Sequence, residues 1–196
     1  MRITSVPVVL LLALSFAFCG CGKKPQPASV PLPTAEAVAA YAEAAFNGNA
    51  RQVAAALQNG MPVDQRDKDG NSGLMLASFN GSVETMQLLL NAKAAVNLRD
   101  NKGRTALMFA ASGPFPEAVR LLLDKGADVN AVDAVDHFSA LMFAAAEGLD
   151  PVVDILLKHG ADPKMKDKDN DTAAKFARDR GFTGLAEKLQ ALIDAP

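Results

Sequence analysis

The sequence predicts an all-α protein in which short helical hairpins stack into a solenoid, with β-turns at the tips that join them. The first reason is a pattern that recurs about every 33 residues, as when Asp67–Met75 aligns with Asp100–Met108. The second is that each copy carries two short apolar segments with helical spacing. The third is size, because so short a unit cannot bury its own apolar face and must pack against its neighbours.

The composition excludes several functions. Hydrophobic residues make up 49% of the 196 residues, so most of the chain can fold around a core. A formal net charge of −2 gives no basic surface for nucleic acid, and no nucleic-acid partner is expected. Two Cys and two His offer little for metal or thiol chemistry, and neither a phosphate-binding loop nor a nucleophile-elbow motif occurs. We therefore expect no enzyme, no catalytic residues, no cofactor and no metal.

Residues 1–20 have the features of an export signal. Arg2 precedes an apolar run from Val8 to Phe18, which as a helix would span about 16 Å, half of a bilayer core. A buried N-terminal helix is the alternative, which the lack of amphipathic spacing disfavours. The sequence Gly-Cys-Gly centred on Cys21 resembles the lipobox of bacterial lipoproteins, in which the Cys becomes diacylated and then N-terminal.

The lipobox resemblance implies a membrane anchor. Acyl chains on Cys21 would hold an exported protein on the cell envelope, facing the periplasm, because each buried methylene contributes about 0.8 kcal/mol. Gly22 after the Cys resembles the sorting pattern for the outer membrane. Residues 21–33 contain four prolines, which predict a semi-extended tether. A cut after the Ser-Phe-Ala of residues 15–17 is the alternative, and it would release a soluble periplasmic protein.

Five repeated units follow the tether. Residues 67–99, 100–132 and 133–166 match the pattern well, and the last of these has one extra residue in its turn. Residues 34–66 and 167–196 match it less well and are predicted to be capping units with polar outer faces. The polar side chains on which this prediction rests are Glu36, Glu43, Asn49, Arg51, Gln52, Lys175, Arg178, Asp179, Glu187 and Lys188.

Local signals predict where the helices begin and end. A hydroxyl side chain precedes each first apolar segment and can cap a helix there. Pro116 and Pro151 mark the start of second helices, where a missing N–H is tolerated. The capping hydroxyls are those of Ser72, Thr105, Ser139 and Thr172, and the glycines expected to end second helices with a positive φ are Gly60, Gly126 and Gly160. The Leu pairs 122–123 and 156–157 should face inward.

The repeated pattern resembles the ankyrin repeat. The consensus of that repeat reads D-x-x-G-x-T-P-L-H-x-A-A, then G-x-x-E-x-V-x-x-L-L, then G-A-D-V-N, and the matches run in register over about residues 36–194. Gly73, Ala106 and Ala140 replace the usual Pro, and Met75, Met108 and Met142 replace the usual His. The resemblance implies stacked helix-turn-helix units that bind another protein through the turn tips and the concave face of the first helices.

Two residue sets have a structural and a functional interpretation. Asp67, Asp69 and Asn71 have the 1-3-5 spacing of a calcium loop, and the last turn repeats it, but the Gly and the Glu that such a loop requires are missing. β-Turn tips are the favoured interpretation. The recurring Met could form an adaptable binding surface, but one Met per first helix favours shared core. Phe109, Phe143 and Phe176, one residue after the Met position, are assigned to the core by the same reasoning.

Candidate partner-binding side chains follow by position from the resemblance. They are Phe79, Asn80, Arg104, Val135, His137, Phe138 and Glu147. Apolar and aromatic side chains at nominally exposed places mark interaction sites more often than scattered lysines do. Phe138 has an alternative, because the inserted residue beside it could let its ring fold back onto the core.

Two functions remain open. The first is a non-catalytic protein-interaction module of the bacterial cell envelope. The second is a protective, immunity-like or inhibitory factor, or a regulator, for an envelope or periplasmic enzyme or toxin. Both need the same anchor and the same binding face, and the sequence does not name the partner.

Lys93 provides a test of the repeat register. It occupies the place where the other units end their second helix with Gly, and a non-glycine residue in the left-handed region costs about 1 kcal/mol or more. We expect Lys93→Gly to raise the melting temperature measured by circular dichroism. A lower melting temperature would mean that the register is wrong at this unit.

Overall fold

The computed structural model describes residues 32–195, so the predicted export signal, Cys21 and most of the tether lie outside the described residues. The described part contains ten helices, no strands, and two isolated β-bridges, Arg66–Ser72 and Val132–Ser139. The helices are α1 (Ala35–Phe46), α2 (Ala50–Gln58), α3 (Gly73–Phe79), α4 (Val83–Asn91), α5 (Ala106–Ala111), α6 (Pro116–Asp124), α7 (Ala140–Ala146), α8 (Asp150–Lys158), α9 (Ala173–Asp179) and α10 (Thr183–Asp194). The prediction of an all-α solenoid is confirmed.

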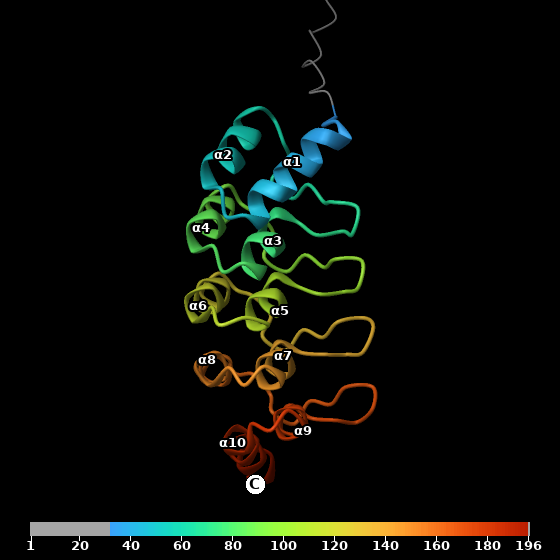
Figure 1. Ribbon diagram of the computed structural model, residues 1–196, viewed down its shortest axis with the longest axis vertical. Helices are drawn as coiled ribbons and strands as arrows, with labels where there is room; N and C mark the ends of the chain where they lie inside the picture. The colour runs from blue at the N-terminus through green and yellow to red at the C-terminus, as the bar shows by residue number, and fades with distance from the viewer. Residues whose placement is uncertain (1–31, 196) are drawn as a thin grey trace, which may run out of the picture. The chain divides into compact units, whose positions relative to one another are not determined.

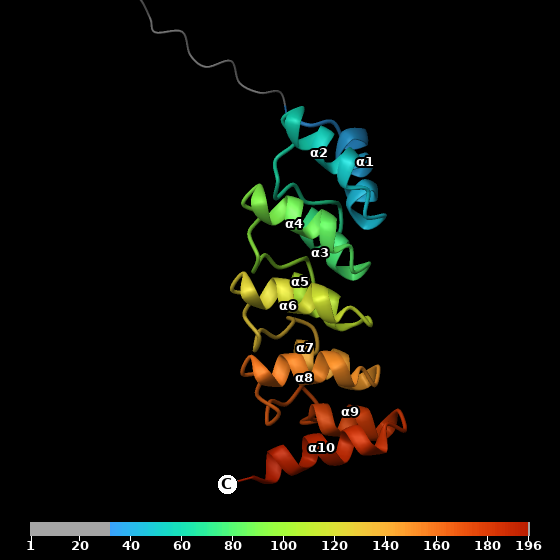
Figure 2. The ribbon, with the colours of Figure 1, turned by 90° about the vertical axis from the view of Figure 1, so that its left-hand side faces the viewer.

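The helices form five antiparallel pairs that stack one on the next (Figures 1 and 2). The first helices of the pairs, α1, α3, α5, α7 and α9, form one column, and the second helices form the other. The loops that join successive pairs project on the side of the first helices (Figure 1). We call these loops fingers 1 to 4; they comprise residues 59–72, 92–105, 125–139 and 159–172. Among the described residues, no helix has the length and apolar character needed to cross a membrane.

The core lies between the two helix columns and between successive pairs. Ala110, Ala144 and Ala145 are fully buried, and their small side chains let neighbouring first helices approach closely. Leu122 and Leu156 are also fully buried, as the periodicity predicts. The leucines that follow them, 123 and 157, are half-buried, because adjacent residues on a helix point about 100° apart.

Three first helices begin at the predicted hydroxyl caps. Ser72 Oγ accepts from the Met75 N–H at 3.4 Å, and Ser139 Oγ accepts from the Met142 N–H at 3.3 Å. In return, each Met sulfur accepts the N–H of its serine at 3.4 Å, so the buried Met completes a reciprocal cap. Thr105 Oγ1 accepts from the Met108 N–H at 3.5 Å. The Met stripe is therefore core, as expected, and it also serves the helix starts.

The prediction of a fourth hydroxyl cap, at Thr172, is wrong. Its side chain makes no capping hydrogen bond to α9. The N–H of Lys175, three residues later, donates to the backbone carbonyl of Thr172 at 2.9 Å rather than to its hydroxyl. The Lys175 side chain turns outward to pair with Asp171 and Asp179, so it has no counterpart of the buried sulfurs of Met75 and Met142. The last unit therefore starts its first helix without the reciprocal cap.

The second helices end as predicted. Gly60, Gly126 and Gly160 have φ of 89°, 85° and 87°, and Lys93 has φ of 70° at the equivalent place. The left-handed conformation of Lys93 is therefore confirmed, which is the premise of the Lys93→Gly prediction. Pro116 is the first residue of α6, whereas α8 begins at Asp150, one residue before its proline.

α1 carries both polar and apolar side chains. Glu36 and Glu43 of α1 are exposed, and an apolar stripe runs along the same helix. This stripe, formed by Ala35, Val38, Ala39 and Ala42, lines a pocket of about 650 Å³ together with residues 65–68 of finger 1. α1 begins several residues before the equivalent first helices, and most of the stripe lies in that extra length. The role of residues 34–66 as a capping unit with a polar outer face stays a prediction.

Tyr41 explains why the second unit starts its first helix with glycine. Its ring is buried, and its hydroxyl donates to the carbonyl of Val63 at 2.9 Å. A Cβ on Gly73 would lie 2.7 Å from the Tyr41 oxygen, whereas the equivalent residues of the next units, Ala106 and Ala140, have no such neighbour. Burial, and secondarily the carboxylate of Asp64, raises the pKa of Tyr41 to about 12.

The raised pKa of Tyr41 predicts alkaline sensitivity. The folded-state pKa lies above the ordinary value of 10.0, so the stabilisation it provides is complete below pH 10 and is lost as the pH rises towards 12. Tyr41 is the only Tyr, and the chain has no Trp, so the near-ultraviolet absorbance of phenolate reports on this group alone. We expect an apparent pKa near 12 in the folded protein and near 10 in urea.

The matched variant is Tyr41→Phe, which leaves the Val63 carbonyl without its donor. It should lower the free energy of unfolding by about 1–2 kcal/mol at neutral pH. The loss relative to wild type should shrink above pH 10, as the wild type loses its own stabilisation. A phenolate titration near pH 10 in the folded protein would contradict the buried position of Tyr41.

Candidate functional site

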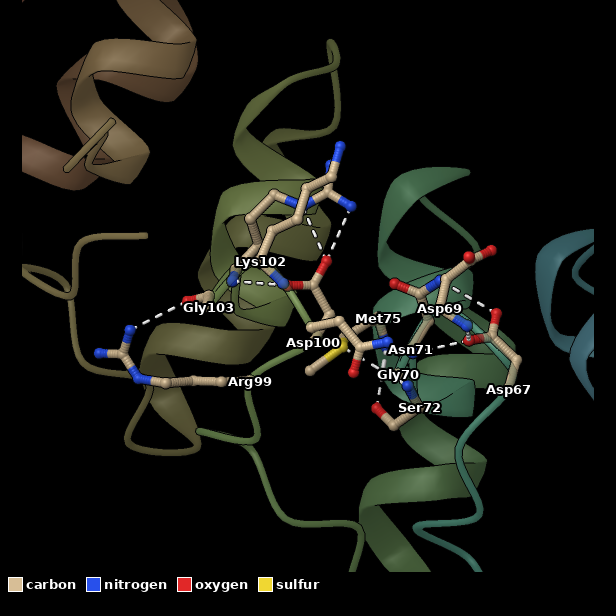
Figure 3. A network of polar contacts seen from close by, with 12 residues as sticks. Asp67, Asp69, Gly70, Asn71, Ser72, Met75, Arg99, Asp100, Lys102 and Gly103 are labelled. Atoms are coloured by element: carbon tan, nitrogen blue, oxygen red, sulfur yellow. Dashed lines mark hydrogen bonds and ion pairs between the residues drawn. The ribbon is translucent and has the colours of Figure 1, made fainter. Parts of the chain in front are cut away.

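The fingers owe their shape to one repeated aspartate. Asp67 Oδ1 accepts the backbone N–H of Asp69 at 2.9 Å and of Asn71 at 2.8 Å (Figure 3). Asp100 Oδ1 accepts two N–H groups at the same spacing in finger 2, and Asp133 and Asp167 repeat this in fingers 3 and 4. These carboxylates therefore fix the turns, in agreement with the β-turn interpretation.

Backbone hydrogen bonds join each finger to the next. The N–H of Asn101 donates to the carbonyl of Asp69 at 3.2 Å, and the N–H of Ala134 donates to that of Lys102 at 2.8 Å. Lys168 and Asp136 repeat the contact at 3.0 Å. Arg99 adds a side-chain link by donating to the carbonyls of Gly103 at 2.9 Å and Val132 at 2.6 Å. The finger tips thus form one continuous edge beside the first helices.

Arg104 lies where finger 2 meets the first helices. Its guanidinium bonds Asp100 Oδ2 through Nε at 2.8 Å and Nη2 at 2.7 Å. The same guanidinium lies over the ring of Phe109, with its carbon 4.5 Å from the ring centroid. A cation held by one carboxylate and one ring face has a fixed position. Arg104 is therefore a half-buried anchor of the surface rather than a freely mobile side chain.

An aromatic cluster continues from Arg104 towards the N-terminus. Phe109 packs edge-on against Phe79, with 6.1 Å between ring centroids and 80° between ring planes. Phe79 in turn stacks on Phe46, with values of 5.8 Å and 21°. Phe79 and Phe46 are 47% and 43% exposed, the highest values among the described phenylalanines. We call Arg104, Phe109, Phe79 and Phe46 the N-terminal cluster.

A second aromatic cluster centres on Phe138. Its ring packs edge-on against Phe143 at 5.7 Å and against Phe176 at 5.0 Å. Phe138 is half-buried, so its ring turns back onto the first helices while keeping one side accessible. The alternative in which the ring folds back onto the first helices is therefore confirmed, and a role of Phe138 in partner binding stays a prediction. We call Phe138, Phe143 and Phe176 the C-terminal cluster.

The assignment of three rings to the core is wrong. Phe109, Phe143 and Phe176 are half-buried, pack against the outside of the core and belong to the two clusters, whereas Met108 and Met142, one residue before the first two rings, are buried. The difference follows from the 100° turn between adjacent helical residues, which points the Met inward and the Phe towards the fingers. Because Phe109 and Phe143 hold the same place in adjacent first helices, the two clusters lie on the same side, and we call them together the aromatic face.

The extra residue of finger 3 brings Val135 and His137 to its tip. Asp133 accepts three N–H groups there, from Val135, Asp136 and His137. Val135 is 46% exposed, and His137 is exposed with φ of 63°, in the left-handed region. Both side chains thus lie on the finger edge, away from the ring contacts of Phe138.

The remaining predicted residues lie at helix ends. Asn80 ends α3 and Glu147 ends α7, and both are exposed. Glu147 pairs with Arg180 of the next unit at 4.0 Å. Of the seven predicted residues, only Phe79 and Arg104 share a cluster. The sequence reasoning missed Phe46, although its position 33 residues before Phe79 was a sufficient signal.

Known families match the repeats. The family described as Ankyrin repeats (3 copies) matches residues 41–133, and the family described as Ankyrin repeat matches residues 136–168. Together the two matches cover more than half of the chain. The chain belongs to the ankyrin-repeat family. No curated protein matches it significantly.

Ankyrin repeats are protein–protein interaction modules and are typically non-catalytic. The pair α9–α10 lies beyond the matched residues, yet α9 packs against α7 as the other first helices pack on one another. Within residues 32–195, no group of three or more His, Cys, Asp or Glu is arranged to hold a metal ion.

Proposed function

We propose that this ankyrin-repeat chain is a non-catalytic module of the bacterial cell envelope that binds another protein through its aromatic face and finger edge. The observation that carries the proposal is the placement of phenylalanine. Six of the eight Phe in the described part belong to the aromatic face, and the buried core of that part is built from Leu, Met, Val, Ile and Ala with Tyr41 as its one aromatic.

Exposed rings are unfavourable unless something covers them. Each partly exposed Phe leaves apolar area in water at a cost of about 25 cal/mol per Å². Aromatic side chains are also enriched among the residues that dominate binding energy at protein interfaces. Rings that recur at equivalent places of successive units, beside a rigid edge of fingers, therefore support a binding face that a partner covers.

The envelope location rests on the N-terminal sequence. The apolar run of residues 8–18, the Gly-Cys-Gly around Cys21 and the Pro-rich residues 22–33 support export, acylation and a spacer. An anchor at Cys21 would hold the ankyrin repeats at the membrane surface, with the outer membrane favoured. A soluble periplasmic form follows if the signal is cut after Ala17 instead.

The Phe79 side chain should contribute much more to partner binding than to the stability of the fold. Because Phe79 is 47% exposed, Phe79→Ala should cost about 1 kcal/mol of unfolding free energy or less, yet weaken partner capture about tenfold. Phe138→Ser should reduce both the free energy of unfolding and the capture of the partner, because that ring is half-buried. Capture is measured by crosslinking in cell envelopes followed by mass spectrometry, and stability by urea unfolding.

Leu192→Ala is the matched control, since Leu192 is 41% exposed on α10, outside the aromatic face. It should leave capture unchanged. Equal loss of capture in Phe79→Ala and Leu192→Ala would refute the aromatic face as the binding site. The activity of a captured enzyme, with and without added protein, then distinguishes a passive interaction module from an inhibitor.

The anchor has its own test. Cys21→Ser should move the protein from the membrane fraction to the soluble fraction and abolish incorporation of labelled palmitate. Cys19→Ser, two residues away, should change neither the membrane location nor the palmitate incorporation, because only Cys21, which follows the small residue Gly20, is acylated. Unlabelled wild-type protein in the soluble fraction would instead support the freely soluble periplasmic form.

A further inference from the structure

The open end of the N-terminal cluster is a two-ring shelf. Phe46 and Phe79 are the last residues of α1 and α3, and their rings stack with only 21° between their planes. Phe109 contacts Phe79 edge-on, and Arg104 lies over Phe109. The order along the surface is therefore cation, ring, ring, ring, and the final ring, Phe46, is 43% exposed.

A carboxylate stands beside this shelf. Glu43 precedes Phe46 by three residues on α1, so the two side chains are neighbours on one helix face. The equivalent residues of the other units are all apolar: Leu76, Phe109, Phe143 and Phe176. Glu43 is exposed and takes part in none of the ion pairs formed within residues 32–195.

The stability of α1 does not explain why residue 43 is a glutamate. It lies in the last turn of α1, which contains no basic residue, and a negative charge at a helix C-terminus is unfavourable. A carboxylate in an unfavourable place, outside the ion pairs of residues 32–195 and about one helical turn from the exposed ring of Phe46, is a combination typical of binding rather than of folding.

Arg104 provides an internal precedent two units away. Its guanidinium is held by one ring face, that of Phe109 at 4.5 Å, and by one carboxylate, that of Asp100 at 2.7 Å. Phe46, Phe79 and Glu43 offer the same two kinds of group, and none of the ion pairs or cation–ring contacts formed within residues 32–195 involves them. The surface thus repeats the kinds of group that hold Arg104.

We propose that Phe46, Phe79 and Glu43 bind an arginine side chain of the partner protein. A guanidinium can stack flat on a ring while its N–H groups reach the carboxylate, whereas a lysine ammonium is a more strongly hydrated point charge. An apolar side chain on the same rings would desolvate Glu43 without pairing it, which is unfavourable. An acidic side chain would be repelled. The inference rests on the proposed function and specifies the partner's chemistry.

The test uses random peptides displayed on phage and selected on the purified full chain. Synthetic versions of the selected peptides are then measured by fluorescence anisotropy. We expect the selected peptides to contain an arginine whose replacement by the neutral analogue citrulline weakens binding about tenfold. Glu43→Gln should weaken the arginine peptides about fivefold and remove most of the difference between arginine and citrulline.

Two controls separate binding from folding and from general charge. Glu43→Gln should not lower the melting temperature, because it removes an unfavourable charge from the end of α1. Glu187→Gln, at an exposed carboxylate of α10, should leave peptide affinity within about twofold.

The outcomes distinguish this inference from the proposed function. Peptides that bind equally well with citrulline, or that tolerate Glu43→Gln, overturn the arginine site, and the aromatic face still stands if Phe79→Ala weakens them. Peptides that tolerate both Phe79→Ala and Phe138→Ser overturn the aromatic face itself, and the proposed function with it.

Discussion

Every feature of this surface depends on the stacking of helix pairs that are too short to be stable alone. α5 has six residues and α3, α7 and α9 have seven, whereas an isolated helix is marginal below about 12–15 residues. Stacking supplies the missing stability by burying alanines and methionines between successive pairs. Asn97 and Asn130 add polar links, each donating to the carbonyl of a glycine in the next unit and accepting an N–H there.

Within each finger, the aspartate that holds the turn is a different residue from those available for recognition. Because Asp67, Asp100, Asp133 and Asp167 fix the turns through backbone groups, the other finger side chains do not have to hold the turn. One place shows this freedom clearly, since it holds Asn71, Arg104, Phe138 and Asp171 in successive units. The same backbone frame can therefore present an amide, a cation, a ring or a carboxylate.

Within residues 32–195, no phenylalanine lies in the fully buried core, and the close packing of the helices explains this. Rows of small side chains bring the first helices close together, which leaves room for Met and Leu but not for stacked rings. Of the phenylalanines in residues 32–195, the two outside the aromatic face are Phe115 and Phe182. They lie where the pairs turn, each over a glycine of the preceding unit, Gly81 and Gly148. A Cβ at either glycine would lie within 2.5 Å of a ring atom, so the glycine makes room for the ring.

The period of the sequence by itself determined the helix pairs, their starts at Ser72, Thr105 and Ser139, and the left-handed residues at Gly60, Lys93, Gly126 and Gly160. These features depend on residues a few places apart, and local spacing encodes them. Only the tertiary structure decided that Phe46 stacks on Phe79, that Arg104 lies over Phe109, and that Phe109, Phe143 and Phe176 leave the core. Those contacts join side chains of different segments, and they depend on how far each helix rotates as the pairs stack, which no single repeat specifies.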